Sequence, residues 1–241
     1  IKFLKKNNIT LLVTATTASV SPAEHIMFMI LNISKGKNFY DQAVRNGKFE
    51  SIMHMKNNNN FELSNKKILI VGFGRIGRKL IKRCLGFEMK VYAYDPFVDK
   101  RIIESFGGIK VDDLNKSLKE IDILSLSVPL TEKTHNMINL EKMKIMKKSA
   151  VIINISRGGV VNERDLNEAL NNKIIYGAGL DVFEKEPPDN ANPLLTNENV
   201  LLSPHAATFT EECLSKMSIE TVQNIINFFE NKLDKSMIVK L

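Results

Sequence analysis

The chain has 241 residues, of which 44% are hydrophobic and 25% charged, a composition typical of a globular protein with one large or two smaller domains. It contains no apolar run long enough to cross a bilayer, and residues 1–6 lack the apolar core of a secretory signal, so we expect a cytoplasmic protein without a membrane partner. The net charge of +7 comes from scattered lysines and not from a basic stripe with interleaved aromatic residues, which argues against nucleic-acid binding.

The two cysteines, Cys84 and Cys213, lie in separate helical patterns. Cysteines placed in this way form neither a disulfide framework nor a metal-ligand spacing. We therefore predict two buried, apolar thiols and no metal site.

The first 65 residues predict a strand, two helices and a loop. Residues 9–14 alternate in the manner of a strand that needs neighbours to pair with. The Ser21-Pro22-Ala23-Glu24 segment has the capping-box pattern of a helix start, and the apolar residues that follow it lie on one helix face. This helix is expected to end near residues 35–36. A short helix over 40–45 and an asparagine-rich loop over 50–65 are expected next.

Residues 67–95 carry the strongest functional signal. A β-branched run over 67–71 leads directly into Gly72, Gly74 and Gly77, the Gly-x-Gly-x-x-Gly spacing of a dinucleotide-binding turn, and a helical pattern follows. The first glycine permits the tight turn, the second lets the backbone approach a pyrophosphate, and the third lets the helix lie against the sheet. The free N–H groups at the helix start then face an anion.

Asp95 ends the next predicted strand, about 20 residues past the glycines, where a carboxylate accepts hydrogen bonds from an adenosine ribose. A 2′-phosphate at this position would meet a like charge, so NAD is favoured over NADP. Arg101 lies close enough in the sequence to weaken this preference. A glycine turn that only packs a strand on a helix, with an incidental aspartate, is the alternative.

Strands and helices alternate through the rest of the chain. Helices are predicted over 99–106, 112–118, 140–146, 162–170 and 210–231, and strands over 121–128, 150–155, 174–180 and 200–202. Such alternation predicts an α/β fold with a doubly wound parallel sheet of the Rossmann type.

Three side chains that are capable of ionic or acid–base chemistry follow the last predicted strands. Arg157, Glu186 and His205 come after three separate strand ends, where ligands bind in an open parallel sheet. An arginine offers a planar fork to a carboxylate, a histidine exchanges a proton near neutral pH, and a glutamate can stabilise its imidazolium. Taken singly, each residue has another interpretation: a surface arginine, a helix-capping histidine and a solvated glutamate. His25, His54 and His135 are assigned no functional role.

Four motifs in order resemble the D-isomer-specific 2-hydroxyacid dehydrogenases, which include 3-phosphoglycerate dehydrogenase and hydroxypyruvate/glyoxylate reductases. They are the glycine turn over 72–77, Ser156-Arg157-Gly158-Gly159, the stretch 179–187 and Ser203-Pro204-His205. The resemblance covers nearly the whole chain. It implies an NAD-dependent enzyme that interconverts a D-2-hydroxy acid and its 2-oxo acid, with phosphoglycerate or hydroxypyruvate/glyoxylate favoured.

The resemblance also assigns roles to individual residues. Arg157 would orient the substrate, His205 would be the acid–base catalyst, and Glu186 would be the partner of His205. The residues expected to contact the cofactor are Gly72, Gly74, Arg75, Ile76, Gly77, Asp95, Val128, Pro129, Ser156 and Asp181.

The same family places a flavodoxin-like substrate domain before the cofactor domain. Residues 1–19 would be a remnant of it, residues 20–208 the NAD-binding domain, and residues 209–241 a helix returning to the substrate domain. The resemblance therefore predicts that this sequence lacks most of the substrate domain, and it leaves two alternatives: an NAD-binding fragment without turnover, or an NAD-sensing protein similar to the family's co-repressors. A homodimer through the cofactor domain is expected, with the helices over 21–45 in the contact.

Overall fold

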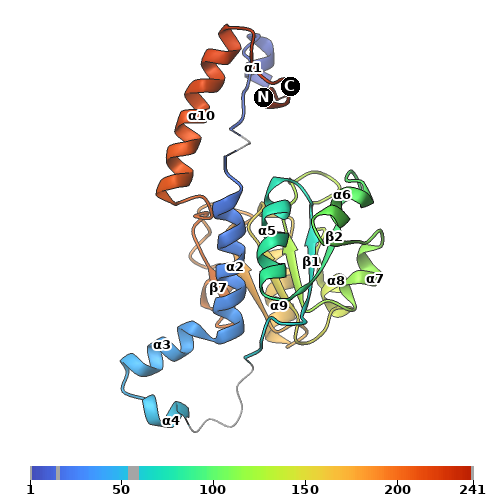
Figure 1. Cartoon of the computed structure of the whole chain (residues 1–241). Helices are drawn as coiled ribbons and strands as arrows, with labels where there is room; N and C mark the ends of the chain where they lie inside the picture. Colours follow the sequence, from blue (N-terminus) through green and yellow to red (C-terminus); the bar gives the residue numbers. More distant parts are fainter. Residues whose placement is uncertain (1, 15–16, 54–59, 240–241) are drawn as a thin grey trace. The chain divides into compact units, whose positions relative to one another are not determined.

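A computed structural model describes residues 2–14, 17–53 and 60–239 (Figure 1). The chain divides into two compact units. The smaller unit comprises residues 1–22 and 208–241, and the larger unit comprises residues 23–207. Within the described residues, none of the helices combines the length and the apolar character required to span a membrane.

The larger unit is built on a seven-stranded sheet in the order β3-β2-β1-β4-β5-β6-β7. Every pair of neighbouring strands is parallel. The strands are β1 (Lys67–Val71), β2 (Lys90–Tyr94), β3 (Ile109–Lys110), β4 (Ile123–Leu126), β5 (Val151–Asn154), β6 (Gly177–Leu180) and β7 (Val200–Leu202). The strand order reverses between β1 and β4, which is the point where open α/β sheets bind ligands.

Helices cover both faces of this sheet. They are α2 (Val20–Lys35), α5 (Arg75–Gly86), α6 (Lys100–Ser105), α7 (Leu114–Leu118), α8 (Leu140–Lys144), α9 (Glu163–Asn171) and the 3-10 turn η1 (Pro193–Thr196). The helices α3 (Lys37–Arg45) and α4 (Phe49–Met53) lie away from the sheet (Figure 1). Apolar residues of α2, α5 and α6 form one buried core, and those of α7, α8 and α9 form a second. The predicted doubly wound α/β fold is therefore confirmed.

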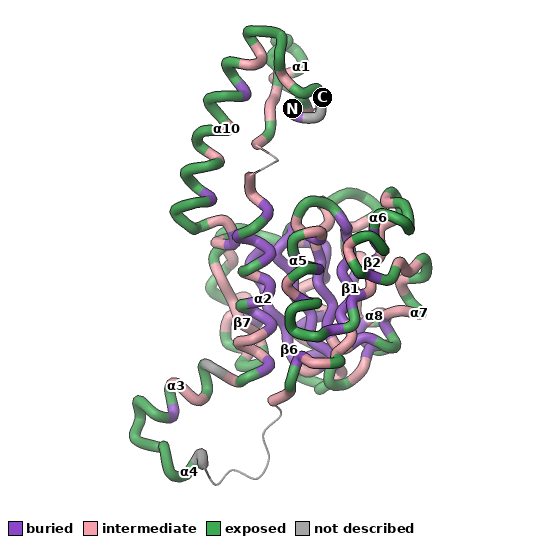
Figure 2. The backbone as a smooth tube through the Cα atoms, in the orientation of Figure 1, coloured by how far each residue is buried: buried purple, intermediate pink, exposed green. Residues whose placement is uncertain are grey.

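The side chains of β1 show how the sheet separates the two cores. Ile68 and Ile70 belong to the core beside α2 and α5, whereas Leu69 and Val71 belong to the core beside α8 and α9. Successive residues of a strand point to opposite faces, so a strand buried on both sides is apolar throughout. Figure 2 shows the buried residues concentrated along the sheet and on the helix surfaces that face it.

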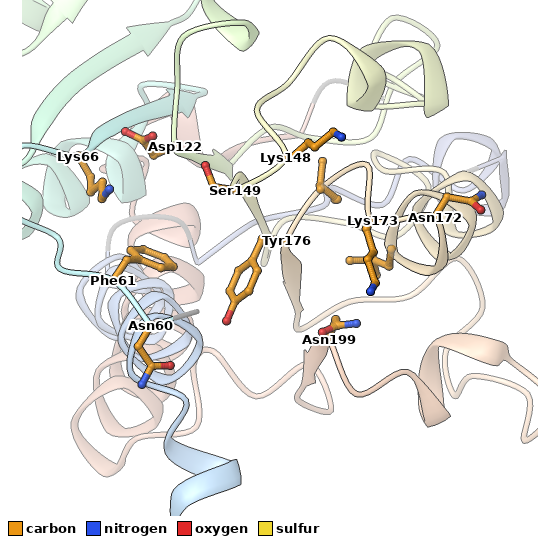
Figure 3. A pocket seen from close by; sticks show the side chains of 12 residues that line it. Asn60, Phe61, Lys66, Asp122, Lys148, Ser149, Asn172, Lys173, Tyr176 and Asn199 are labelled. Carbon is orange, nitrogen blue, oxygen red and sulfur yellow. The ribbon is translucent and has the colours of Figure 1, made fainter. Parts of the chain in front are cut away.

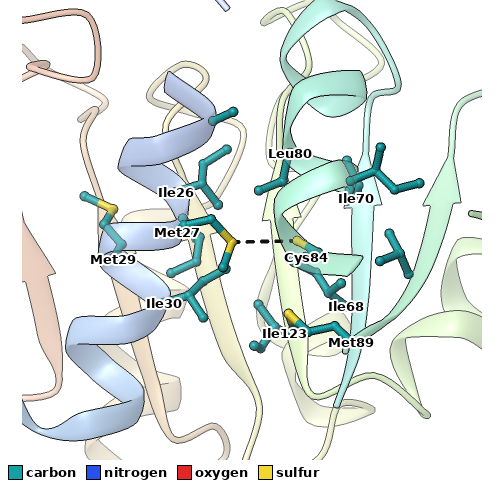
Figure 4. Packing of buried hydrophobic residues seen from close by; sticks show 14 of the residues in the cluster. Ile26, Met27, Met29, Ile30, Ile68, Ile70, Leu80, Cys84, Met89 and Ile123 are labelled. Atoms are coloured by element: carbon teal, nitrogen blue, oxygen red, sulfur yellow. Dashed lines mark hydrogen bonds between the residues drawn. The ribbon is translucent and has the colours of Figure 1, made fainter. Parts of the chain in front are cut away.

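The predicted first long helix packs against the helix that follows the glycine turn (Figure 4). Ile26, Met27 and Ile30 of α2 are buried in the same core as Leu80 and Cys84 of α5. The Cys84 Sγ atom lies 3.8 Å from the Met27 Sδ atom. Burial raises the pKa of the Cys84 thiol to about 12, which keeps it protonated and unreactive.

The smaller unit contains α1 (Lys2–Lys6), α10 (Glu211–Phe229) and the 3-10 turn η2 (Lys235–Met237). The prediction of a strand over 9–14 was wrong: its described pairing is a single antiparallel bridge between Leu12 and Ile238. A strand needs a partner along its length, and this segment has one only at that bridge. The Asn224 side chain of α10 donates a hydrogen bond to the Val13 carbonyl at 3.2 Å and ties the helix to the segment.

Other boundaries also differ from expectation. The helix α2 begins at Val20, so Ser21 lies within its first turn and does not precede it. The helix α4 occupies part of the predicted loop over 50–65, and residues 60–65 have no helix or strand. The short strand β3 was not predicted. His54, placed in a loop by the sequence, lies outside the described residues.

Candidate functional site

The glycine turn between β1 and α5 has no room for side chains at two of its three glycines. Gly72 has a φ of +95°, and a Cβ there would lie 2.4 Å from the carbonyl oxygen of Ser127. A Cβ at Gly77 would lie 2.5 Å from the carbonyl oxygen of Gly72. Both distances are far shorter than a contact between non-bonded atoms allows. The turn at Gly72 and the close approach of α5 to the turn at Gly77 therefore require glycine.

Gly74 differs, because a Cβ there would meet no atom within 4 Å. It is the N-cap residue of α5, and no side chain caps this helix end. The first residues of the helix, Arg75 and Ile76, therefore present their N–H groups to the open space above the turn, where a helix N-terminus attracts an anion. This empty, positively polarised cradle fits the pyrophosphate of a dinucleotide.

Asp95 lies directly beside the turn. Its carboxylate accepts hydrogen bonds from the backbone N–H of Phe73 at 2.8 Å and of Phe97 at 2.9 Å. A carboxylate has about four lone-pair positions, so two bonds fix its orientation and leave acceptor capacity for a ribose. The geometry thus suits the role that the sequence predicts for this residue.

The next strand ends bring further predicted residues to the same edge of the sheet. Val128 and Pro129 follow β4, and a Cβ at Gly72 would lie 3.0 Å from the Val128 side chain. Ser156 follows β5 and is buried, with its Oγ donating a hydrogen bond to Asn154 Oδ1 at 2.7 Å. The hydroxyl of Ser156 is therefore directed into the protein.

Asn154 organises the segment that carries Arg157, a role that the sequence analysis missed. Its Oδ1 atom accepts the Ser156 N–H at 3.0 Å, and its Nδ2 atom donates to the Arg157 carbonyl at 3.0 Å. The sequence feature that could have identified this role is the position of Asn154, a polar residue inside the apolar run 151–155. The Arg157 Nη1 atom donates to the Ser156 carbonyl at 2.6 Å, and the residue is otherwise exposed.

Glu186 and His205 form a hydrogen-bonded pair. The Glu186 Oε2 atom lies 2.8 Å from the His205 Nδ1 atom, and Glu186 Oε1 accepts the Phe183 N–H at 3.1 Å. Burial on its own would raise the pKa of the Glu186 carboxyl, but the His205 imidazole, the Phe183 N–H and the Arg157 guanidinium together lower it. The Glu186 side chain is therefore held as a carboxylate against the Nδ1 side of the His205 ring.

The loop that carries His205 is held by Asp181, the residue at the end of β6. Asp181 is fully buried, and its carboxylate accepts hydrogen bonds from Ser203 Oγ at 2.5 Å, Ala206 N at 2.7 Å and Ala207 N at 2.9 Å. His205 has a φ of +53°, a left-handed conformation that is rare outside glycine. The Asp181 contacts stabilise this conformation. The N-cap of α10 is Thr210, so His205 is not the cap of that helix.

His25 joins this cluster, although the sequence analysis assigned it no function. Its Nε2 atom lies 2.9 Å from Ser203 Oγ and 3.6 Å from Asp181 Oδ1. Burial lowers the pKa of His25 more than the neighbouring Asp181 carboxylate raises it. Nothing in the spacing of residues 25, 181 and 203 revealed this contact, which links the start of α2 to the ends of β6 and β7.

A cavity of about 450 Å³ adjoins the Glu186–His205 pair. Its wall includes the apolar side chains of Phe183, Leu202 and Pro204. Groups of three or more potential metal ligands are absent from the described part of the chain. The site therefore combines an acid–base pair, an exposed arginine and an apolar recess.

Taken together, the strand order, the glycine turn and Asp95 define a dinucleotide-binding domain of the Rossmann class. The chain belongs to the D-isomer-specific 2-hydroxyacid dehydrogenase family, because the model of that family's NAD-binding domain matches residues 27–207. This match confirms the resemblance and the expected cofactor.

Individual relatives of the chain support this family assignment. The chain is 36% identical over 221 residues to the D-3-phosphoglycerate dehydrogenase of Methanocaldococcus jannaschii, covering 92% of this chain and 41% of that protein. It is 39% identical over 198 residues to the glyoxylate reductase of Korarchaeum cryptofilum, covering 82% and 59% respectively. The chain thus spans about half the length of these two relatives.

A solved structure shows the same architecture. The D-lactate dehydrogenase of Aquifex aeolicus, in complex with NAD and lactic acid, superposes with a TM-score of 0.85 at 31% identity. The similarity covers 99% of this chain and 75% of that one.

Proposed function

We propose that the protein is an NAD-dependent oxidoreductase that interconverts a D-2-hydroxy acid and its 2-oxo acid. The observation that carries this proposal is the 2.8 Å contact between Glu186 and His205 at the carboxyl edge of the sheet. The pair lies at the same edge as the glycine turn. The positive charge of Arg157 helps to lower the pKa of the Glu186 carboxyl. An acid–base group, a carboxylate-binding cation and a dinucleotide cradle are what this reaction needs.

Arg157 binds the carboxylate of the substrate and polarises its 2-oxo group, because a guanidinium presents parallel N–H donors to planar oxygen pairs. The imidazolium of His205 donates a proton to the carbonyl oxygen during reduction, and the neutral imidazole accepts it back during oxidation. Glu186 holds the Nδ1 side of the ring and stabilises its charged form, which leaves Nε2 for the substrate.

The residues of the glycine turn hold the cofactor. The open side of Gly74 and the free N–H groups of Arg75 and Ile76 bind the pyrophosphate, while Asp95 binds the adenosine ribose. Val128 and Pro129 line the remainder of the cofactor site, and the buried residues Ser156 and Asp181 hold the loops that border it. Bound NAD supplies the hydride acceptor and donor chemistry.

The proposed substrates are hydroxypyruvate, glyoxylate or phosphoglycerate. The names of the relatives support this class, since one is a D-3-phosphoglycerate dehydrogenase and another a glyoxylate reductase. The net charge of +7 is compatible with an anionic substrate.

NAD binding without turnover is the second candidate. The family model that matches residues 27–207 is that of the NAD-binding domain, which supports cofactor binding by this chain independently of turnover. A co-repressor-like NAD-sensing protein would show the same absence of turnover.

We also propose that residues 1–19 and 209–241 belong to a substrate domain and residues 20–208 to the cofactor domain. The division of the chain into residues 23–207 and the remaining segments supports these boundaries. In α10, Ile219, Val222 and Phe229 are between 58% and 77% exposed, which suits a helix that packs against more of such a domain.

A homodimer is proposed through α2. Phe28 and Phe87 are 52% and 42% exposed and border an open, apolar groove between α2 and α5. Glu24 and Arg83 form an ion pair in the same groove, so the surface offers apolar contact together with charged positions that a second copy can match. Phe28→Asp is expected to yield monomers in analytical ultracentrifugation, and the control Phe97→Asp, at a 91% exposed site elsewhere, is expected to leave the dimer intact.

The activity is tested by the loss of NADH absorbance with hydroxypyruvate, glyoxylate, pyruvate and 2-oxoglutarate. Chiral chromatography follows for every product except glycolate, which glyoxylate yields and which is achiral. Turnover of any of the four is the expected result, with the D enantiomer formed wherever the product is chiral. Tight NADH binding without oxidation by any of the four would favour the second candidate.

A further inference from the structure

A second cavity lies at the opposite edge of the sheet from the proposed cofactor site (Figure 3). Its volume is about 620 Å³. Lys66 immediately precedes β1, Lys148 and Ser149 precede β5, and Tyr176 precedes β6, so the cavity opens at the amino ends of the strands. Nothing in the proposed reaction uses this edge.

Positive charge dominates the cavity. Lys66, Lys148 and Lys173 line it, and none of the three forms an ion pair with any residue that the structure describes. The single acidic side chain of the lining, Asp122, already binds the Lys147 Nζ atom and the Lys67 N–H, each at 2.8 Å. The carboxylate is therefore compensated, and the three ammonium groups have an excess charge that favours an anion.

Two aromatic rings form an apolar surface in the same cavity. Phe61 and Tyr176 pack edge to face, with ring centroids 6.1 Å apart and planes at 77°. The Lys66 Nζ atom lies 5.8 Å from the Phe61 ring centroid, and the buried side chains of Leu170 and Ile175 complete the apolar part. Within the described residues the Tyr176 hydroxyl has no hydrogen-bond partner, and Figure 3 shows it directed into the hollow.

We propose that this cavity is a second small-molecule site, which binds an anion that carries an aromatic ring. The ring of the ligand packs against Phe61 and Tyr176, because aromatic rings favour offset or edge-to-face contact with one another. Its acidic group pairs with Lys148 and Lys173, which lie on the segments before β5 and after α9, and it accepts a hydrogen bond from the Tyr176 hydroxyl. Neither a simple anion nor a neutral ring would use both parts of the cavity.

The test uses phenyl phosphate as the probe and ligand-observed NMR as the measurement, with saturating NADH present so that the dinucleotide site is closed. Phenyl phosphate is expected to bind more tightly than either inorganic phosphate or benzyl alcohol. The double variant Lys148→Gln/Lys173→Gln is expected to weaken its binding by about tenfold or more, because charged hydrogen bonds are lost.

The matched control is Lys82→Gln/Lys119→Gln, which removes two exposed lysines outside the cavity and is expected to bind phenyl phosphate as the unmodified chain does. A second variant, Phe61→Leu, is expected to reduce the advantage of phenyl phosphate over inorganic phosphate. Unchanged binding in the Lys148/Lys173 variant, equal affinity for inorganic phosphate, or no binding of phenyl phosphate while NADH is saturating would each overturn the proposal.

Discussion

The carbonyl oxygen of Asp181 accepts a hydrogen bond from the backbone N–H of His205 at 2.8 Å. The carboxylate of the same residue binds the next two N–H groups, those of Ala206 and Ala207. A fully buried residue at the end of β6 thus fixes the left-handed backbone that carries the proposed acid–base catalyst. The position of His205 depends on Asp181 as well as on its partner Glu186.

Asp181→Asn tests this dependence. An amide has one acceptor oxygen in place of two, so at least one backbone N–H of the loop loses its partner inside the protein. The free energy of unfolding, measured by urea denaturation, is expected to fall by about 1–3 kcal/mol. Asp112→Asn, at a side chain that is 88% exposed, is the control and should change it little. Equal stability of both variants would show that the loop is held by other contacts.

Glycine substitutions separate folding from cofactor binding. Gly74→Ala is expected to leave the free energy of unfolding nearly unchanged and to reduce NADH affinity, because its Cβ would enter only the open cradle. Gly72→Ala, in contrast, should destabilise the fold by more than about 1 kcal/mol, since its φ of +95° and the Ser127 carbonyl both oppose a side chain.

Gly86→Ala is the control for these two variants, because it adds a methyl group to α5 where no atom lies within 4 Å. Titration of NADH and urea denaturation of the three variants provide the measurements. Full NADH affinity in Gly74→Ala would contradict the placement of the pyrophosphate.

Asp95→Asn should reduce the preference for NADH over NADPH. The amide oxygen can still accept from the backbone at the turn, but the negative charge that repels a 2′-phosphate is gone. The ratio of the two dissociation constants is the measurement, with Asp112→Asn as the control for a general change in surface charge. An unchanged ratio would remove Asp95 from the cofactor site.

His25 is expected to make stability pH-dependent. Its pKa in the folded protein lies below the ordinary value of 6.5, so at intermediate pH the unfolded chain binds more protons. Stability is therefore lost as the pH falls from about 7 through this range, by less than about 1.4 kcal/mol per pH unit. His25→Gln should flatten the slope, and His135→Gln, at an exposed histidine, is the control. Identical slopes in wild type and His25→Gln would contradict the assignment.

The sequence predicted the architecture because its signals are local. The apolar run 67–71, the glycines at 72, 74 and 77, and the repeated alternation of strands and helices each depend on neighbouring residues. The predicted Asn162 helix start is also found, with Asn162 Oδ1 accepting the Asp165 N–H at 2.9 Å. The pairing of Glu186 with His205 was expected from the common edge where parallel strands end.

The contacts that the sequence did not reveal join distant segments. His25 meets Ser203 across 178 positions of the chain, and no local pattern encodes that distance. The prediction of a strand over 9–14 was wrong for a related reason. A strand forms only where a partner segment pairs with it, and local alternation of residues does not indicate whether such a partner exists. Asn154 was overlooked because a polar residue in an apolar run has no assigned partner until the loop after it is folded.

We propose that His205 transfers the proton while other residues hold the cofactor. The most direct test measures both NADH affinity and turnover of the 2-oxo acid panel in His205→Gln beside the unmodified chain. Turnover is expected to fall by roughly 10²- to 10⁴-fold while the dissociation constant of NADH changes little. Turnover equal to that of the unmodified chain, or a parallel loss of NADH binding, would contradict it.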